Sequence, residues 1–227
     1  LLYTGTFGSF IGYSAGFPLL MKTQFPEINA LQFAFLGPLV GALSRSMTGW
    51  VSDKWGGARV TFWVFLLMIV AVAGVLYFLG MKDQPGAFWG FFAMFMVLFF
   101  ATGVGNASTF QMIPIMMREE MPRLMPQLDV NARLRQSEKE SVAIIGFTSA
   151  IAAYGAFFIP KSYGTSISMT GGPEAALVGF LAFYVLCAAV TWLVYSRKGG
   201  LLHEIERGGR RGTPPAQPST LAKGGVA

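Results

Sequence analysis

Charged residues are scarce in this sequence. Only 12% of its 227 residues are Asp, Glu, Lys or Arg, whereas 53% are hydrophobic. A soluble domain carries about 25% charged residues, so the composition favours a helical membrane protein. The net charge is +6, but the basic residues stand between the apolar runs. That distribution is typical of membrane-flanking loops and not of a surface that binds nucleic acid, so we expect no nucleic-acid partner.

Cysteine and histidine are also nearly missing, with one of each. Cys187 lies inside an apolar run and His203 lies in the polar C-terminal stretch. A single cysteine excludes an internal disulfide and a cysteine-rich metal site. We therefore interpret Cys187 as a packing residue and expect neither a metal nor a cofactor.

Enzyme motifs are absent as well. The sequence contains no phosphate-binding loop, no H-E-x-x-H and no G-x-S-x-G. All 11 Asp and Glu residues fall in loops, at the ends of apolar segments or in the C-terminal stretch. Since no carboxylate pair is available inside the apolar segments, we do not expect an enzyme.

What the sequence does contain is six apolar segments long enough to cross a bilayer, which takes about 20 residues each. They are Leu1–Met21, Leu31–Val51, Val60–Gly80, Phe88–Met117, Val142–Pro160 and Glu174–Tyr195. No alternating β-strand pattern is present. The chain begins with Leu1 inside the first segment and shows no signal peptide, so we expect an N-terminal part to be missing.

The basic residues are distributed unequally between the two sides of a six-span arrangement. Thirteen of the 17 Lys and Arg fall in the second loop, the fourth loop and the C-terminal tail. Only Lys22, Lys82 and Lys161 fall on the other side. The positive-inside rule therefore predicts a cytoplasmic C-terminus. We expect the fourth loop, Arg118–Glu140, to be a surface connector with a short helix on the membrane, and residues 199–227 to be a disordered tail.

Arg45 is the one charged residue well inside a span. Gly37, Gly41, Arg45 and Gly49 recur every four residues, which predicts that Arg45 projects along a helix face cleared of side chains. A mid-span arginine costs about 2.5–3.5 kcal/mol on insertion scales, so it needs a counter-ion. Its planar fork of donors matches a planar oxyanion held by two oxygens. The residues alone leave open whether the counter-ion is a carboxylate from outside this sequence or a substrate anion.

Other spans carry weaker candidates. Tyr3 and Phe7 are four residues apart and share a helix face, while Asn106 lies in a polar, small-residue patch of the fourth span. Gly146 and Ser149 belong to the small-residue-rich fifth span. Ordinary helix packing is an alternative explanation for each of these patterns.

The loop that follows Arg45, GWVSDKWGGAR, resembles the G-x-x-x-D-[RK]-x-G-x-[RK] motif of the major facilitator superfamily. Gly49, Asp53, Lys54, Gly56 and Arg59 match, the last of them one residue late because of an extra glycine. Asp53 can cap a helix terminus and pair with a basic residue across the loop. Such a latch favours one conformational state, so we interpret this loop as a gating element and not as a substrate site.

The resemblance becomes more specific in five further stretches: TFGSFIGYSAGF, KTQFP, GPLVGALSR, GNASTFQMIP and GFTSAIAAYGAFFIPKSYG. Together they resemble the nitrate/nitrite porter family of that superfamily, from Leu1 to about Arg197. The resemblance implies an all-α membrane protein whose residues 1–198 form the C-terminal six-helix half of a twelve-helix transporter in a bacterial inner membrane. It also implies that nitrate and nitrite are the substrates, and that the missing N-terminal half and the lipid bilayer are the partners.

The resemblance assigns roles residue by residue. Arg45 would be one of two arginines that clamp the anion, and Tyr3 and Phe7 would wall the site. Gly146 and Ser149 would belong to the signature helix that lines the path. Asn106 is added to the substrate-binding candidates on its polarity and position.

The implied mechanism is alternating access about a site near the middle of the membrane. Proton coupling usually needs an Asp, Glu or His within the membrane, and none lies in mid-span here. We therefore expect nitrate/nitrite exchange in preference to nitrate–proton symport. Transport of another anion within the superfamily, and a membrane-anchored sensor or assembly protein that does not transport, remain as alternatives.

Overall fold

The computed structural model describes residues 1–197, and these are almost entirely helical, with no β-strand among them. The elements are the π-helical stretch η1 (Thr4–Gly8), then α1 (Ser9–Gln24), α2 (Ala30–Phe33), α3 (Leu36–Met47), α4 (Gly49–Trp55), α5 (Gly57–Gly80), α6 (Ala87–Leu124), α7 (Val130–Ala153), α8 (Gly155–Thr170), α9 (Glu174–Val190) and the π-helical stretch η2 (Thr191–Ser196). The tail expected at residues 199–227 lies outside the described residues.

Four helices of the described chain are long and apolar enough to cross a membrane. They are Gly57–Gly80, Ala87–Leu124, Val130–Thr170 and Glu174–Ser196. These lengths and compositions are those of a multi-pass membrane protein. They correspond to the last four predicted spans.

The first two predicted spans are built differently. Leu1–Met21 corresponds to η1 followed without interruption by α1, because Gly8 and Ser9 keep helical backbone angles. Leu31–Val51 is divided among α2, α3 and α4. The predicted count of six spans therefore stays a prediction.

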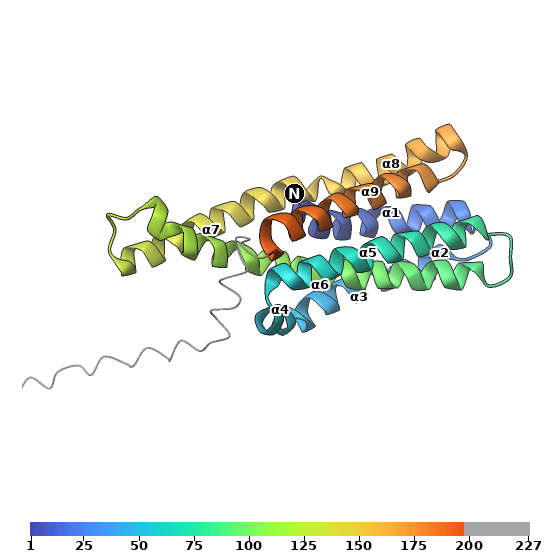
Figure 1. Ribbon diagram of the computed structural model, residues 1–227. Coiled ribbons are helices and arrows are strands. Elements are labelled where there is room, and N and C mark those ends of the chain that lie inside the picture. Colours follow the sequence, from blue (N-terminus) through green and yellow to red (C-terminus); the bar gives the residue numbers. More distant parts are fainter. Residues whose placement is uncertain (198–227) are drawn as a thin grey trace, which may run out of the picture.

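The fourth predicted loop is not a surface connector with a short helix on the membrane. Instead α6 continues to Leu124 and α7 begins at Val130, so the charged stretch forms a helical hairpin that projects from one end of the bundle (Figure 1). Asp129 caps α7 by accepting a hydrogen bond from the backbone N–H of Ala132 at 2.7 Å. Because the turn is short, the two long helices leave the bundle side by side.

Aromatic side chains pack against one another in the core between α1, α6 and α9. The fully buried rings include Tyr13, Phe17, Phe91, Phe95, Phe99 and Tyr184. The ring centroids of Phe17 and Phe95 lie 4.8 Å apart, and Tyr13 meets Phe95 edge-to-face at 5.9 Å. Such pairs add about 0.5–1.5 kcal/mol each beyond the area they bury, so α1 is held firmly against α6.

Glycines bring two pairs of backbones into close contact beside this core. A Cβ on Gly103 of α6 would collide with the carbonyl of Gly41 and the hydroxyl of Ser44 on α3. A Cβ on Gly155, at the junction of α7 and α8, would collide with the carbonyl of Gly8. Close approach at small residues is the usual way in which membrane helices associate. The first of these contacts fixes the helix that carries Arg45.

Candidate functional site

Arg45 lies on the exposed side of α3, where η1 and α6 meet it. Its guanidinium carbon is 6.0 Å from the ring centroid of Phe7 and 6.0 Å from that of Phe110. Tyr3 lies one turn before Phe7, with the two ring centroids 5.2 Å apart. Rings at this distance attract a cation through their quadrupoles, so the guanidinium is held between two aromatic side chains from different helices.

The charge of Arg45 is not neutralised within residues 1–197, where no carboxylate is recorded within salt-bridge distance of it. A salt bridge elsewhere in the described chain joins Arg123 and Glu120 at 3.2 Å, in the hairpin of α6 and α7. Arg45 therefore offers an exposed cation in the last turn of α3, a helix of 12 residues, and not in the middle of a long span as the sequence predicted. An anion or a carboxylate of another segment can pair with it.

The glycine face predicted beside Arg45 is not an open strip. A Cβ on Gly37 would meet the ring of Phe99, and a Cβ on Gly41 would meet the ring of Phe10. Both glycines are buried, and Arg45 lies at the edge of the face they form. The glycines thus let aromatic side chains pack against α3, and they do not clear a path for the arginine.

Gly49 also does not continue that face, because α3 ends at Met47. Thr48 leaves the helix with φ −107° and ψ 5°, and its hydroxyl donates to the carbonyl of Ser44 at 2.5 Å. The carbonyl of Gly49 accepts a hydrogen bond from the side-chain amide of Gln111 on α6 at 3.3 Å. The junction between the arginine helix and the gating loop is therefore held by α6.

Asp53 does not cap a helix, so the capping role predicted for it is wrong. It lies exposed with Lys54 in the last turn of α4, while the residues at the start of α4 and of α5 are Thr48 and Gly56, neither of which makes a side-chain cap. Gly56 separates the two helices with φ 92° and ψ 132°, a backbone conformation that is unfavourable for residues other than glycine. Arg59 follows in the first turn of α5.

Replacing Gly56 by alanine is expected to destabilise the turn by about 1–3 kcal/mol, because a Cβ is strained at this φ. The thermal unfolding midpoint of the purified protein in detergent should fall. Gly80→Ala is the matched control, since Gly80 lies at the end of α5 with open space around it. Equal midpoints for the two variants would show that the turn at Gly56 is not strained.

None of the remaining candidates is among the recorded contacts of Arg45. Asn106 is buried on α6, and its side-chain carbonyl oxygen has no hydrogen-bond partner in the described chain. Gly146 is exposed on α7 with nothing near it, and Ser149 is partly exposed one turn further on. The recorded contacts of Arg45 come from η1 and α6, and none comes from α7. The structure thus joins Arg45 with Phe7 and Tyr3 but does not bring Gly146 and Ser149 to them.

Phe110 is the residue of this site that the sequence interpretation missed. It lies four residues after Asn106 in a helix, so its position within the polar patch was the available signal. Phe110 is 36% exposed beside the guanidinium, which leaves part of its ring free to contact a bound solute.

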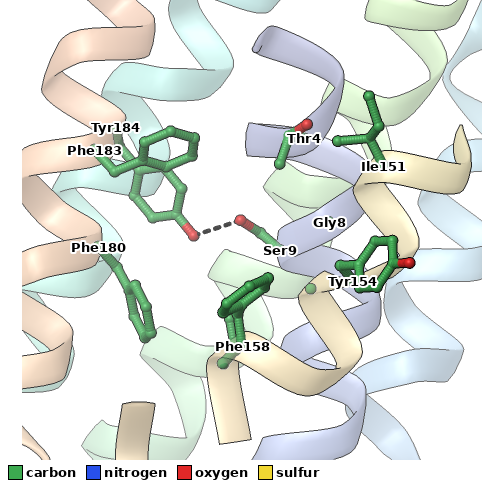
Figure 2. A pocket seen from close by; sticks show the side chains of 11 residues that line it. Thr4, Gly8, Ser9, Ile151, Tyr154, Phe158, Phe180, Phe183 and Tyr184 are labelled. Atoms are coloured by element: carbon green, nitrogen blue, oxygen red, sulfur yellow. Dashed lines mark hydrogen bonds between the residues drawn. The ribbon is translucent and has the colours of Figure 1, made fainter. Parts of the chain in front are cut away.

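A separate cavity of about 350 Å³ lies among η1, α1, the junction of α7 and α8, and α9. Figure 2 shows that Phe158, Phe180 and Phe183 surround it, and that the hydroxyl of Tyr184 donates to Ser9 at 2.7 Å on one side. Its walls are almost wholly apolar, and Arg45 is not among them. This cavity is therefore a poor site for an inorganic anion.

Residues 1–197 define a class first: a multi-pass helical membrane protein in which an arginine, flanked by aromatic rings and paired with no carboxylate of these residues, lies beside a glycine-rich loop. No protein-family model matches the chain. Over 202 residues it is 48% identical to the nitrate/nitrite transporter NarU of Salmonella typhimurium and 47% identical to NarU of Escherichia coli. It is 36% identical over 202 residues to the probable nitrate/nitrite antiporter NarK2 of Thermus thermophilus.

Across the matched region the chain is homologous to these nitrate/nitrite transporters, which supports its resemblance to the nitrate/nitrite porter family. The matched region covers 87% of this chain in each of these comparisons, but only 43% of the two NarU proteins and 41% of NarK2. The chain thus spans less than half the length of the curated relatives that it matches.

Proposed function

We propose that this chain is the C-terminal six-helix half of a twelve-helix major facilitator transporter, and that the complete protein exchanges nitrate and nitrite across a bacterial inner membrane. The relatives named as nitrate/nitrite transporters and the coverage of less than half their length support this proposal. The observation that carries it is Arg45, an exposed cation in the last turn of α3 with aromatic rings on two sides.

In this proposal Arg45 binds the anion through two parallel N–H···O hydrogen bonds. A planar guanidinium and a planar oxyanion match in shape, and the bidentate arrangement also fixes the anion's orientation. Phe7 and Phe110 hold the guanidinium by its recorded ring contacts, and Tyr3 packs beside Phe7. A second arginine from the N-terminal half completes the clamp.

Charge explains how binding drives closure. Two arginines that approach each other without an anion repel, and a monovalent anion between them reduces that repulsion. With the anion bound, the two halves can therefore close over the site, and the site can then open to the opposite side of the membrane. Asn106, Gly146 and Ser149 line the path in this scheme. Their contribution is to solvate or pass the anion, because none of them carries a charge.

The gating role belongs to the loop of Gly49, Asp53, Lys54, Gly56 and Arg59. Its first helix, α4, follows the arginine helix after a single residue, so a displacement of α3 is transmitted directly to the loop. Asp53 and Lys54 are exposed on α4 and available to a partner segment. We place this loop, like the C-terminus, on the cytoplasmic side.

One experiment distinguishes nitrate/nitrite exchange from nitrate–proton symport. Proteoliposomes loaded with nitrite should take up labelled nitrate at an unchanged rate after an ionophore collapses the pH gradient, because no Asp, Glu or His lies in the middle of the membrane helices described. Uptake that stops under this treatment would favour nitrate–proton symport. Vesicles without internal nitrite are the control, since an exchanger needs a counter-substrate.

A further inference from the structure

A buried hydroxyl pair lies directly behind the rings that hold Arg45. The side-chain oxygens of Thr6 on η1 and Thr109 on α6 are 3.0 Å apart. Both side chains are buried, at 0% and 4% exposure. Thr6 immediately precedes Phe7 and Thr109 immediately precedes Phe110, so one hydrogen bond joins the two segments that carry the flanking rings.

The distances around the pair favour one direction for its hydrogen bond. Thr109 Oγ1 lies 2.7 Å from the carbonyl oxygen of Gly105, the shorter of its contacts, and a hydroxyl has one proton to donate. With that proton on Gly105, Thr109 accepts from Thr6. The carbonyl oxygens of Leu2 and Tyr3 are longer alternatives for Thr6, at 3.3 Å and 3.4 Å.

The backbone around Thr6 needs such support. Thr4–Gly8 is π-helical, a geometry that is rare and that concentrates at functional sites. Tyr3 borders this stretch and Phe7 lies within it. A side-chain hydrogen bond from a rigid neighbouring helix is a direct way to fix this turn and the ring it carries.

We propose that Thr109 is a positioning residue for anion binding. Through Thr6 it fixes η1 against α6, and so sets the separation between Phe7 and Phe110 at which the guanidinium of Arg45 is held. The inference rests on the proposed function, because it concerns the same site. Thr109 is not proposed to contact the anion.

A neighbouring pair supplies the comparison. Ser108 and Thr61 of α5 have their hydroxyl oxygens 2.8 Å apart and are equally buried. This pair joins α6 to α5 and does not adjoin either ring. Removing the hydroxyl of Ser108 deletes a similar hydrogen bond one residue away from Thr109. Comparing the two variants therefore distinguishes a general loss of packing from a loss of ring position.

The test is nitrate uptake by the full-length protein in proteoliposomes. Thr109→Val should raise the KM for nitrate about fivefold, the effect of one ordinary hydrogen bond, with kcat little changed. Thr109→Ser should restore the wild-type KM, and Ser108→Ala should leave it unchanged. Thr6→Val should match Thr109→Val, and the double variant should be no worse than either single one.

Two outcomes overturn the inference: an unchanged KM in Thr109→Val, or equal increases in Thr109→Val and Ser108→Ala. A wild-type protein without nitrate uptake would instead contradict the proposed function. Hydrogen exchange of the backbone amides of residues 4–8, read in the purified protein, then still tests the positioning role. Faster exchange in Thr109→Val than in Ser108→Ala supports it, and equal exchange overturns it.

Discussion

Replacing Arg45 by lysine is expected to raise the KM for nitrate by about 10- to 100-fold, the value of one charge-assisted hydrogen bond. Lysine keeps the positive charge but loses the rigid fork of donors that holds a planar anion by two oxygens. It also loses the flat face that lies beside the rings of Phe7 and Phe110. The measurement is the concentration dependence of labelled nitrate uptake in proteoliposomes.

The control for this variant is Arg123→Lys. Arg123 is a surface residue of the α6–α7 hairpin, with its side chain 77% exposed and paired with Glu120. The KM of the Arg123→Lys variant for nitrate should equal that of the wild type. An unchanged KM in Arg45→Lys would argue for a different anion within the superfamily. Absence of nitrate uptake in the wild-type protein would favour a sensor or assembly protein.

Folding should be unaffected in Arg45→Lys, because the residue is exposed and the charge is kept. Its elution on size exclusion and its thermal midpoint should match those of the wild type. A loss of uptake accompanied by a large loss of stability would therefore contradict a direct role in anion binding.

The sequence predicted best those features that depend on position along the chain. Hydropathy located the four long helices, since twenty or so apolar residues mark a span wherever they pack. The isolation of Arg45 within an apolar run marked it as a candidate site residue, and its role in anion binding stays a prediction. The glycine-rich loop expected at Gly49–Arg59 contains a break between helices, where Gly56 separates α4 from α5 with a positive φ.

Features that depend on contacts between helices were not predictable in the same way. The end of α3 at Met47 was not predicted, because Trp50 and Val51 follow Thr48 and extend the apolar segment to Val51. Phe110 reaches Arg45 from a helix more than sixty residues away in the chain, so no spacing rule connects them. Mixed charge together with Pro122 and Pro126 led us to expect a surface connector at Arg118–Glu140, yet α6 continues through Pro122 to Leu124.

The packing of α3 on α6 leads to the second large effect. Replacing Gly103 by alanine is expected to displace α3, because the new Cβ would collide with the carbonyl of Gly41 and the hydroxyl of Ser44. A backbone carbonyl cannot turn aside as a flexible side chain can, so overpacking here should cost about 1–3 kcal/mol. Gly41 is one helical turn before Arg45, so the displacement should also move the guanidinium relative to Phe110.

Two measurements on Gly103→Ala separate these effects: the thermal midpoint in detergent and the KM for nitrate. We expect the midpoint to fall and the KM to rise together. Gly179→Ala is the matched control, since Gly179 is an exposed glycine of α9 with open space around it. If Gly103→Ala behaved like Gly179→Ala in both measurements, the close contact of α3 with α6 would not determine the position of Arg45. A normal midpoint with a raised KM would show that α3 can shift without unfolding, which is the freedom that coupling between Arg45 and the gating loop requires.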